Sequence, residues 1–357
     1  MRFVLKTNYH RDVDLFRDKF QFCWFAVLLV FVLSLPMFTG TYVESQLTLV
    51  FLWSIAGAGL MILVGYTGLI SLGHAAFLSV GAYTHAILLD LGVPPFVSIP
   101  SAMLLCSVLG VVVSIAALRM TGIYLAIATL AFAMIVEKVV KNWSSVTGGN
   151  AGFKVAPPEI FGWELNSTAY YYLCLLVLTL VMLGVSNLLR APTGRAFIAV
   201  RDSEISAQAT GINLVKTKAL AFAVSAALAG LAGTLLAYQW HYLFPDSFSM
   251  ITSIKLLMLV IIGGLGSMSG VIFGAIFMTL LPDGIATVRE WLPDSIGNLP
   301  GLEPFSFGLI LILFLIFEPR GISGRWQKIR LFFSQFPLYR NRTFRRQKSF
   351  LRTERVH

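Results

Sequence analysis

The chain has little charge. Only 12% of its 357 residues are Asp, Glu, Lys or Arg, 57% are hydrophobic, and the mean hydropathy is +0.79. Soluble domains carry about twice that charged fraction. The hydrophobic runs are long and do not alternate with polar residues, which excludes a transmembrane β-barrel. The composition therefore predicts an all-α polytopic membrane protein.

Residue patterns for common enzyme chemistry are also absent. No Gly-Lys dipeptide occurs, so there is no phosphate-binding loop of the G-x-x-x-x-G-K-[ST] kind, and there is no H-E-x-x-H motif. The three cysteines lie in apolar runs without metal-binding spacing. His74 and His85, on apolar segments, are expected to hydrogen-bond to neighbouring helices. We therefore expect no catalytic residue, no cofactor and no metal.

Carboxylates inside the apolar segments are nearly missing, and Glu137 is the best candidate. Carriers driven by protons or sodium usually need ionisable groups near the middle of the membrane. Their scarcity indicates that the driving energy comes from outside this chain.

About ten apolar segments are candidate membrane spans. Two of them, 254–264 and 270–282, are too short to cross a hydrocarbon core of about 30 Å unaided. The sequence therefore predicts a permease domain over residues 22–318, between a segment at 1–21 and a tail at 319–357. The candidate spans are 22–38, 47–65, 74–90, 95–118, 122–140, 169–190, 217–240, 254–264, 270–282 and 304–318.

Glycine-rich joins lie at 65–74 and 263–270. They share the spacing of Gly, Leu, Ser and Phe, which fits either an internal duplication or chance among glycine-rich membrane segments. Backbone groups at a helix break must be buried in protein or face water, because lipid cannot bind them. We therefore predict that both joins interrupt helices and lie beside a translocation path. The predicted path residues are Gly68, Ser71, Gly73, His74, Gly264 and Ser267.

Basic residues are distributed unevenly between the two sides. With the N-terminus inside and the spans alternating, 22 of the 27 Lys and Arg fall on the inner side. The positive-inside rule then places both termini in the cytoplasm. The net charge of +10 lies in membrane-flanking segments, which argues against a nucleic-acid partner. The basic tail after residue 319 is expected to contact anionic lipid or, alternatively, to dock on a protein.

The segment 190–218 is a long polar interruption on the inner side. It holds five Lys or Arg, and the apolar residues at roughly helical spacing are Phe197, Val200, Ile205, Ala209 and Ile212. An ordered amphipathic helix on the charged side of a membrane protein usually docks something there. We predict a short helix from Glu204 to Ile212 that lies along the membrane.

Several stretches together resemble branched-chain amino acid ABC transporter permeases of the LivM type. The resemblance covers about residues 45–324, and the N-terminal extension and basic tail lie outside it. The stretches that carry it are G-Y-T-G-L-I-S-L-G-H-A-A-F from Gly65, T-G-I-Y from Thr121, T-G-G-N-A-G from Thr147, R-D at Arg201, G-I-N at Gly211, I-G-G-L-G-S from Ile262 and E-P-R-G-I from Glu318.

The resemblance implies one half of an importer in a bacterial inner membrane. Its partners would be a sister permease, two cytoplasmic ATPases and a periplasmic binding protein. The family's coupling segment would correspond to 190–218, although Ile205-Ser206 replaces the usual pair of alanines after the glutamate. Substrate choice would rest with the binding protein, since related permeases serve urea, amides and other amino acids. A self-sufficient secondary carrier or channel is the alternative. The implied ATPase-coupling residues are Arg201, Glu204, Ala207, Gly211 and Ile212.

Overall fold

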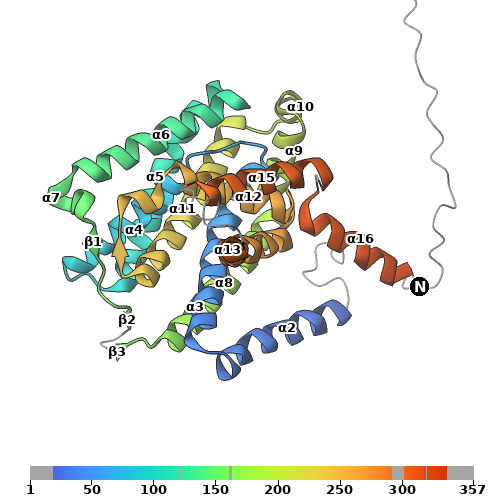
Figure 1. Ribbon diagram of the computed structural model, residues 1–357. Helices are drawn as coiled ribbons and strands as arrows, with labels where there is room; N and C mark the ends of the chain where they lie inside the picture. Colours follow the sequence, from blue (N-terminus) through green and yellow to red (C-terminus); the bar gives the residue numbers. More distant parts are fainter. Residues whose placement is uncertain (1–18, 121, 161–162, 292–300, 319, 336–357) are drawn as a thin grey trace, which may run out of the picture.

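The computed structural model describes residues 19–335, apart from residues 121, 161–162, 292–300 and 319. This part of the chain is almost entirely helical (Figure 1). The main helices are α2 Lys19–Phe38, α3 Thr41–Leu60, α4 His74–Asp90, α5 Pro95–Arg119, α6 Ile123–Asn142, α8 Ser167–Arg190, α9 Pro192–Asp202, α10 Glu204–Ala209, α11 Leu214–Trp240, α12 Met250–Gly263, α13 Met268–Trp291, α15 Leu302–Phe317 and α16 Gly321–Gln335.

Shorter elements connect these helices. A six-residue π-helix, η1 Met61–Tyr66, continues α3. The segment between α6 and α8 holds α7 Ser144–Thr147, the 3-10 turn η2 Gly149–Ala151 and the strands β1 Phe153–Lys154, β2 Glu159–Ile160 and β3 Trp163–Glu164. Strand β1 pairs antiparallel with β4 Tyr242–Leu243, and β2 pairs with β3. The 3-10 turn η3 Pro245–Phe248 precedes α12.

Each of the ten predicted spans coincides with a helix. Seven helical segments of the described chain are long and apolar enough to cross a membrane. The other three are shorter: α4 has 17 residues, and the apolar parts of α2 and α15 are Ala26–Phe38 and Phe305–Phe314. The predicted all-α polytopic fold is therefore confirmed.

The prediction that 254–264 and 270–282 are both too short was wrong. Helix α13 runs for 24 residues and passes through Pro282 without ending there. The apolar stretch around α12 begins at Pro245 and spans 19 residues with η3 included. Proline is tolerated inside membrane helices because neighbouring groups satisfy the freed carbonyl, so it is a poor stop signal here.

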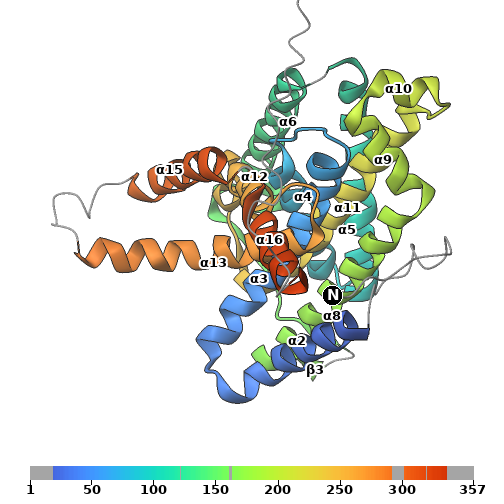
Figure 2. The ribbon, with the colours of Figure 1, turned by 90° about the vertical axis from the view of Figure 1, so that its right-hand side faces the viewer.

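The core lies around α11, which packs against α3, α4 and α5. Helices α4 and α11 approach closely at Gly81 and Gly230, where a Cβ added to Gly81 would collide with the Gly230 backbone. Small residues allow such close packing in membranes, where lipid is as apolar as the side chains. Figure 2 shows α9 and α10 on one side of this core and α13 and α15 projecting on the other.

Residues 1–18 and 336–357 lie outside the described residues. They make up most of the predicted cytoplasmic N-terminal segment, 1–21, and most of the basic tail, 319–357. The described start of that tail forms α16, a helix that the sequence analysis did not predict. It packs against α12 and α13, and Trp326 lies beside Phe273 with ring centroids 6.1 Å apart. At least this part of the tail is therefore joined to the permease core.

Candidate coupling segment and helix breaks

The polar segment 190–218 holds two short helices, α9 and α10, and ends in the first turns of α11. Helix α9 begins with Pro192 in its first turn, where the missing N–H costs nothing. Its buried residues Phe197 and Val200 fix one face against the rest of the chain. Ser203 separates α9 from α10, and its Oγ accepts a hydrogen bond from the Ser206 N–H at 3.3 Å. We call residues 192–212, the part of 190–218 that holds α9 and α10, the coupling segment, after the role that the family resemblance implies for 190–218.

Helix α10 ends at a glycine, as its sequence suggests. Gly211 has a φ of +88°, a conformation that favours glycine. Its N–H donates to the Gln208 carbonyl, and the Ile212 N–H donates to the Ala207 carbonyl. These two bonds form a Schellman motif, which satisfies carbonyls that the end of the helix leaves open.

The predicted coupling residues do not all face outward. Ala207 is only 2% exposed, so its side chain packs within this chain. By contrast, Ile205 is 84% exposed, as high as any large hydrophobic residue of the described chain and equal to Phe38. Sequence spacing did not separate the two, because alanine fits equally well on a buried or an exposed face.

The charges of the coupling segment are engaged inside the chain. The Glu204 carboxylate accepts a hydrogen bond from Lys218 Nζ at 2.8 Å. Lys218 is 2% exposed and also donates to the Ala117 carbonyl, in the last turn of α5, at 3.0 Å. Arg201 forms an ion pair with Asp202 at 3.0 Å. Arg201 and Glu204, two of the coupling residues that the family resemblance implies, therefore both bind groups of this chain.

The first glycine-rich join separates η1 from α4. Gly68 has a φ of +75°, and Ser71 and His74 are fully buried. His74 Nε2 lies 3.3 Å from Ser225 Oγ of α11, as expected for a histidine bonded to a neighbouring helix. His85 also bonds to a neighbouring helix, because its Nδ1 lies 2.8 Å from Ser98 Oγ of α5.

Gly73 of the same join packs tightly on the Thr129 carbonyl of α6. The Leu72 N–H donates to Thr129 Oγ1 at 3.0 Å. The backbone at this break is thus bonded to protein, which is the arrangement that burial in a membrane requires.

The second join separates α12 from α13. Gly264 has a φ of +113° and packs on the Arg320 carbonyl. Ser267 Oγ accepts a hydrogen bond from Ser323 Oγ of α16 at 2.6 Å. Helix α16 and the residue before it therefore pack against this break.

The two joins meet each other, although about 200 residues separate them in the sequence. A Cβ added to Gly65 would lie 2.9 Å from the Gly266 backbone nitrogen. The Gly266 N–H donates to the Met61 sulfur at 3.2 Å. Arg201 Nη1 donates to the Gly65 carbonyl at 3.1 Å. The end of α9 therefore contacts the place where both helices are broken.

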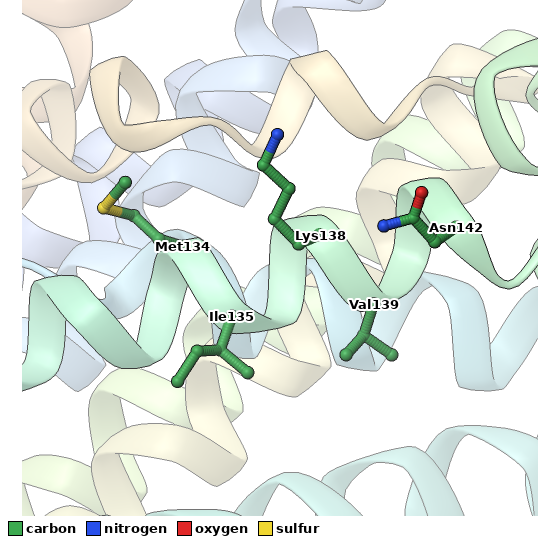
Figure 3. A pocket seen from close by; sticks show the side chains of 5 residues that line it. All are labelled: Met134, Ile135, Lys138, Val139 and Asn142. Atoms are coloured by element: carbon green, nitrogen blue, oxygen red, sulfur yellow. The ribbon is translucent and has the colours of Figure 1, made fainter.

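Other parts of the described chain offer no comparable site. The hollow in Figure 3 is lined by Met134, Ile135, Lys138, Val139 and Asn142, whose side chains all spread from one helix, α6. No group of three or more His, Cys, Asp or Glu that could hold a metal occurs among the described residues.

Fold and site together define a polytopic membrane protein with an ordered polar segment and two helix breaks that contact each other. Residues 42–317 match the family described as "Branched-chain amino acid transport system / permease component". The chain belongs to this family, and it is a transport component rather than an enzyme.

Several relatives support this membership. The chain is 31% identical to the high-affinity branched-chain amino acid transport system permease protein LivM of Escherichia coli, over 85% of this chain and 75% of that protein. It is 26% identical to LivH of the same organism, over 81% and 94%, and 26% identical to a probable LivM of Methanocaldococcus jannaschii, over 62% and 67%. No solved structure shows a significant match.

Proposed function

We propose that this chain is one of two permease subunits of an ATP-driven importer for branched-chain or related amino acids. It would lie in a bacterial inner membrane with both ends in the cytoplasm. It would assemble with a sister permease, two cytoplasmic ATPases and a periplasmic binding protein. The relatives named as high-affinity branched-chain amino acid permeases support the substrate class.

The exposed Ile205 on α10 is the observation that carries the coupling role. A large aliphatic side chain that is 84% exposed on the charged side of the protein has no partner within the described chain to cover it. Protein interfaces commonly centre on such an anchor in a pocket of the partner, surrounded by smaller contacts. The exposed residues around it are small or polar: Ser206, Gln208, Ala209, Thr210 and Gly211.

This surface refines the coupling residues implied by the family. Ile205 takes the anchor role, Gly211 shapes the exit from α10, and Ile212 is half-buried behind it. Arg201, Glu204 and Ala207 hold the segment to the permease instead of contacting the ATPase. The translocation path remains assigned to the two joins. Ser71 and His74 are buried within this chain, so their role would be to shape the break rather than to contact substrate.

The test uses Ile205→Asp, which places a charge at the centre of the proposed contact. Loss of an anchor typically costs 2 kcal/mol or more, about 30-fold in affinity. We expect the ATPases to separate from the permease during purification and amino-acid uptake into cells to stop. Val215→Asp is the matched control, because Val215 is also exposed and an acid in the first turn of α11 is favourable.

The control variant should retain both ATPase binding and uptake. Normal co-purification and uptake with Ile205→Asp would overturn the assignment of α10. Uptake by the purified permease without any ATPase would instead support the alternative of a self-sufficient carrier.

A further inference from the structure

Arg201 occupies an unusual position between the coupling segment and the translocation domain. It lies at the end of α9, one residue before that helix ends at Asp202. Its Nε and Nη2 donate to Asp202 Oδ1, at 3.1 and 3.0 Å, within its own helix. Its Nη1 reaches out of the segment and donates to the Gly65 carbonyl at 3.1 Å. One guanidinium group thus joins two elements that are 136 residues apart in sequence.

The Gly65 carbonyl belongs to the last turn of the long helix formed by α3 and η1. The last carbonyls of a helix lack partners within the helix, and a cation there also interacts favourably with the helix dipole. Arg201 therefore acts as a cap for this helix, supplied from the coupling segment. π-Helical turns such as η1 are uncommon and frequently mark functional positions.

Both helix breaks converge on this cap. A Cβ added to Gly68 would lie 3.0 Å from Arg201 Cγ, and one added to Gly266 would lie 3.6 Å from Arg201 Nη1. A displacement of α9 would thus reach η1, the first break and the second break through one side chain.

We propose that Arg201 is the positioning residue that transmits movement of the coupling segment to the two glycine-rich joins. The inference rests on the proposed function, because the movement would come from a docked ATPase. Arg201 itself would contact neither ATP nor the transported solute. Its planar guanidinium binds Asp202 and Gly65 at the same time, which lysine, with a single ammonium group, cannot reproduce in the same geometry.

The experiment compares Arg201→Gln and Arg201→Lys with the control Arg195→Gln in the complete complex reconstituted with its ATPases and binding protein. Arg195 is an exposed arginine on the same helix, and its guanidinium donates to the nearby Arg190 carbonyl. We expect Arg201→Gln to keep the ATPases bound while uptake falls at least about fivefold, the lower end of usual coupling between sites. Arg201→Lys should recover part of the uptake, and Arg195→Gln should match the parent protein.

A second readout follows the break directly. Ile70 lies in the first join and is 36% exposed, so Ile70→Cys in a background without the native cysteines reports on that segment. In the parent, the rate of labelling by a hydrophilic maleimide should differ between the nucleotide-free and the ATP-trapped complex. With Arg201→Gln, the two rates should become equal.

The outcomes separate this proposal from the proposed function. A parental complex that does not bind ATPases would refute the function itself. Loss of ATPase binding with Arg201→Gln would make Arg201 a docking contact, and parental uptake with an unchanged labelling difference would make it a static cap. If Arg201→Gln and Arg201→Lys lower the thermal stability equally and the labelling difference persists, the proposal that Arg201 transmits movement would also be overturned.

Discussion

The buried pair of Lys218 and Glu204 should stabilise the coupling segment asymmetrically. Lys218 is 2% exposed and Glu204 is 35% exposed. Replacing Glu204 with Met leaves a buried ammonium group with the Ala117 carbonyl as its remaining acceptor. Removing one partner of a fully buried pair costs about 3–5 kcal/mol. Because Glu204 is partly exposed, and water screens partly exposed pairs, we expect about 2–3 kcal/mol.

Replacing Lys218 with Met should cost less. The carboxylate left behind is one-third exposed and reaches water, so the main loss is the hydrogen bond to Ala117, about 1 kcal/mol. The double variant Glu204→Met with Lys218→Met has no stranded charge and should resemble Lys218→Met alone. The two residues should therefore show an interaction energy of about 2–3 kcal/mol in a double-mutant cycle, equal to the cost of Glu204→Met alone.

Thermal unfolding of the detergent-purified chain, followed by tryptophan fluorescence, measures this order. One kcal/mol shifts the midpoint by about 2 °C in a protein of this size, so Glu204→Met should lower it by about 4–6 °C. Arg325→Met is the control, since Arg325 is 69% exposed in its pair with Glu318 and surface pairs contribute about 0–1 kcal/mol. Equal losses for both single variants, or a double variant that sums them, would refute the reasoning.

Two further predictions concern packing and topology. Gly81→Val should destabilise the core by about 1–3 kcal/mol or more, because the new side chain would collide with Gly230, whereas Gly184→Val, with open space around it, should change the unfolding midpoint little. A reporter that is active only in the periplasm, fused after His357, should stay inactive, because the basic residues place that end in the cytoplasm, and activity there would overturn the orientation.

The sequence predicted the helices well where apolar runs were long and bounded by polar residues. The span expected at 95–118 is the helix Pro95–Arg119, and the one at 169–190 is Ser167–Arg190. It failed at α13, where Pro282 looked like an end but lies inside the helix. Local composition sets where a helix can form, but its end depends on whether neighbours satisfy the backbone that proline frees.

The sequence indicated the separate segments of the candidate site but not the contacts between them. The two joins, the coupling segment and Arg201 were each singled out, but α9 was not expected as a separate helix. Nothing in the sequence indicated that Arg201 reaches Gly65, because contacts between distant segments depend on the tertiary fold. The same limit applies to Lys218, which counted only as one more inner-side charge and is buried against Glu204 and Ala117.

The contacts of the coupling segment with the rest of the chain determine which elements a force on this segment would displace. Two polar contacts join the segment to distant helices: Glu204 binds Lys218, which also bonds the end of α5, and Arg201 binds the end of η1. The first contact lies between α5 and α11, which are tightly packed where Gly110 touches the Phe222 carbonyl, and close-packed helices resist small displacements. The second contact lies on a π-helical turn beside two helix breaks, where the regular helical hydrogen-bond pattern is interrupted. A force on Ile205 should therefore displace the two joins before it separates α5 from α11. The coupling segment would then rotate while its contact with Lys218 stays in place.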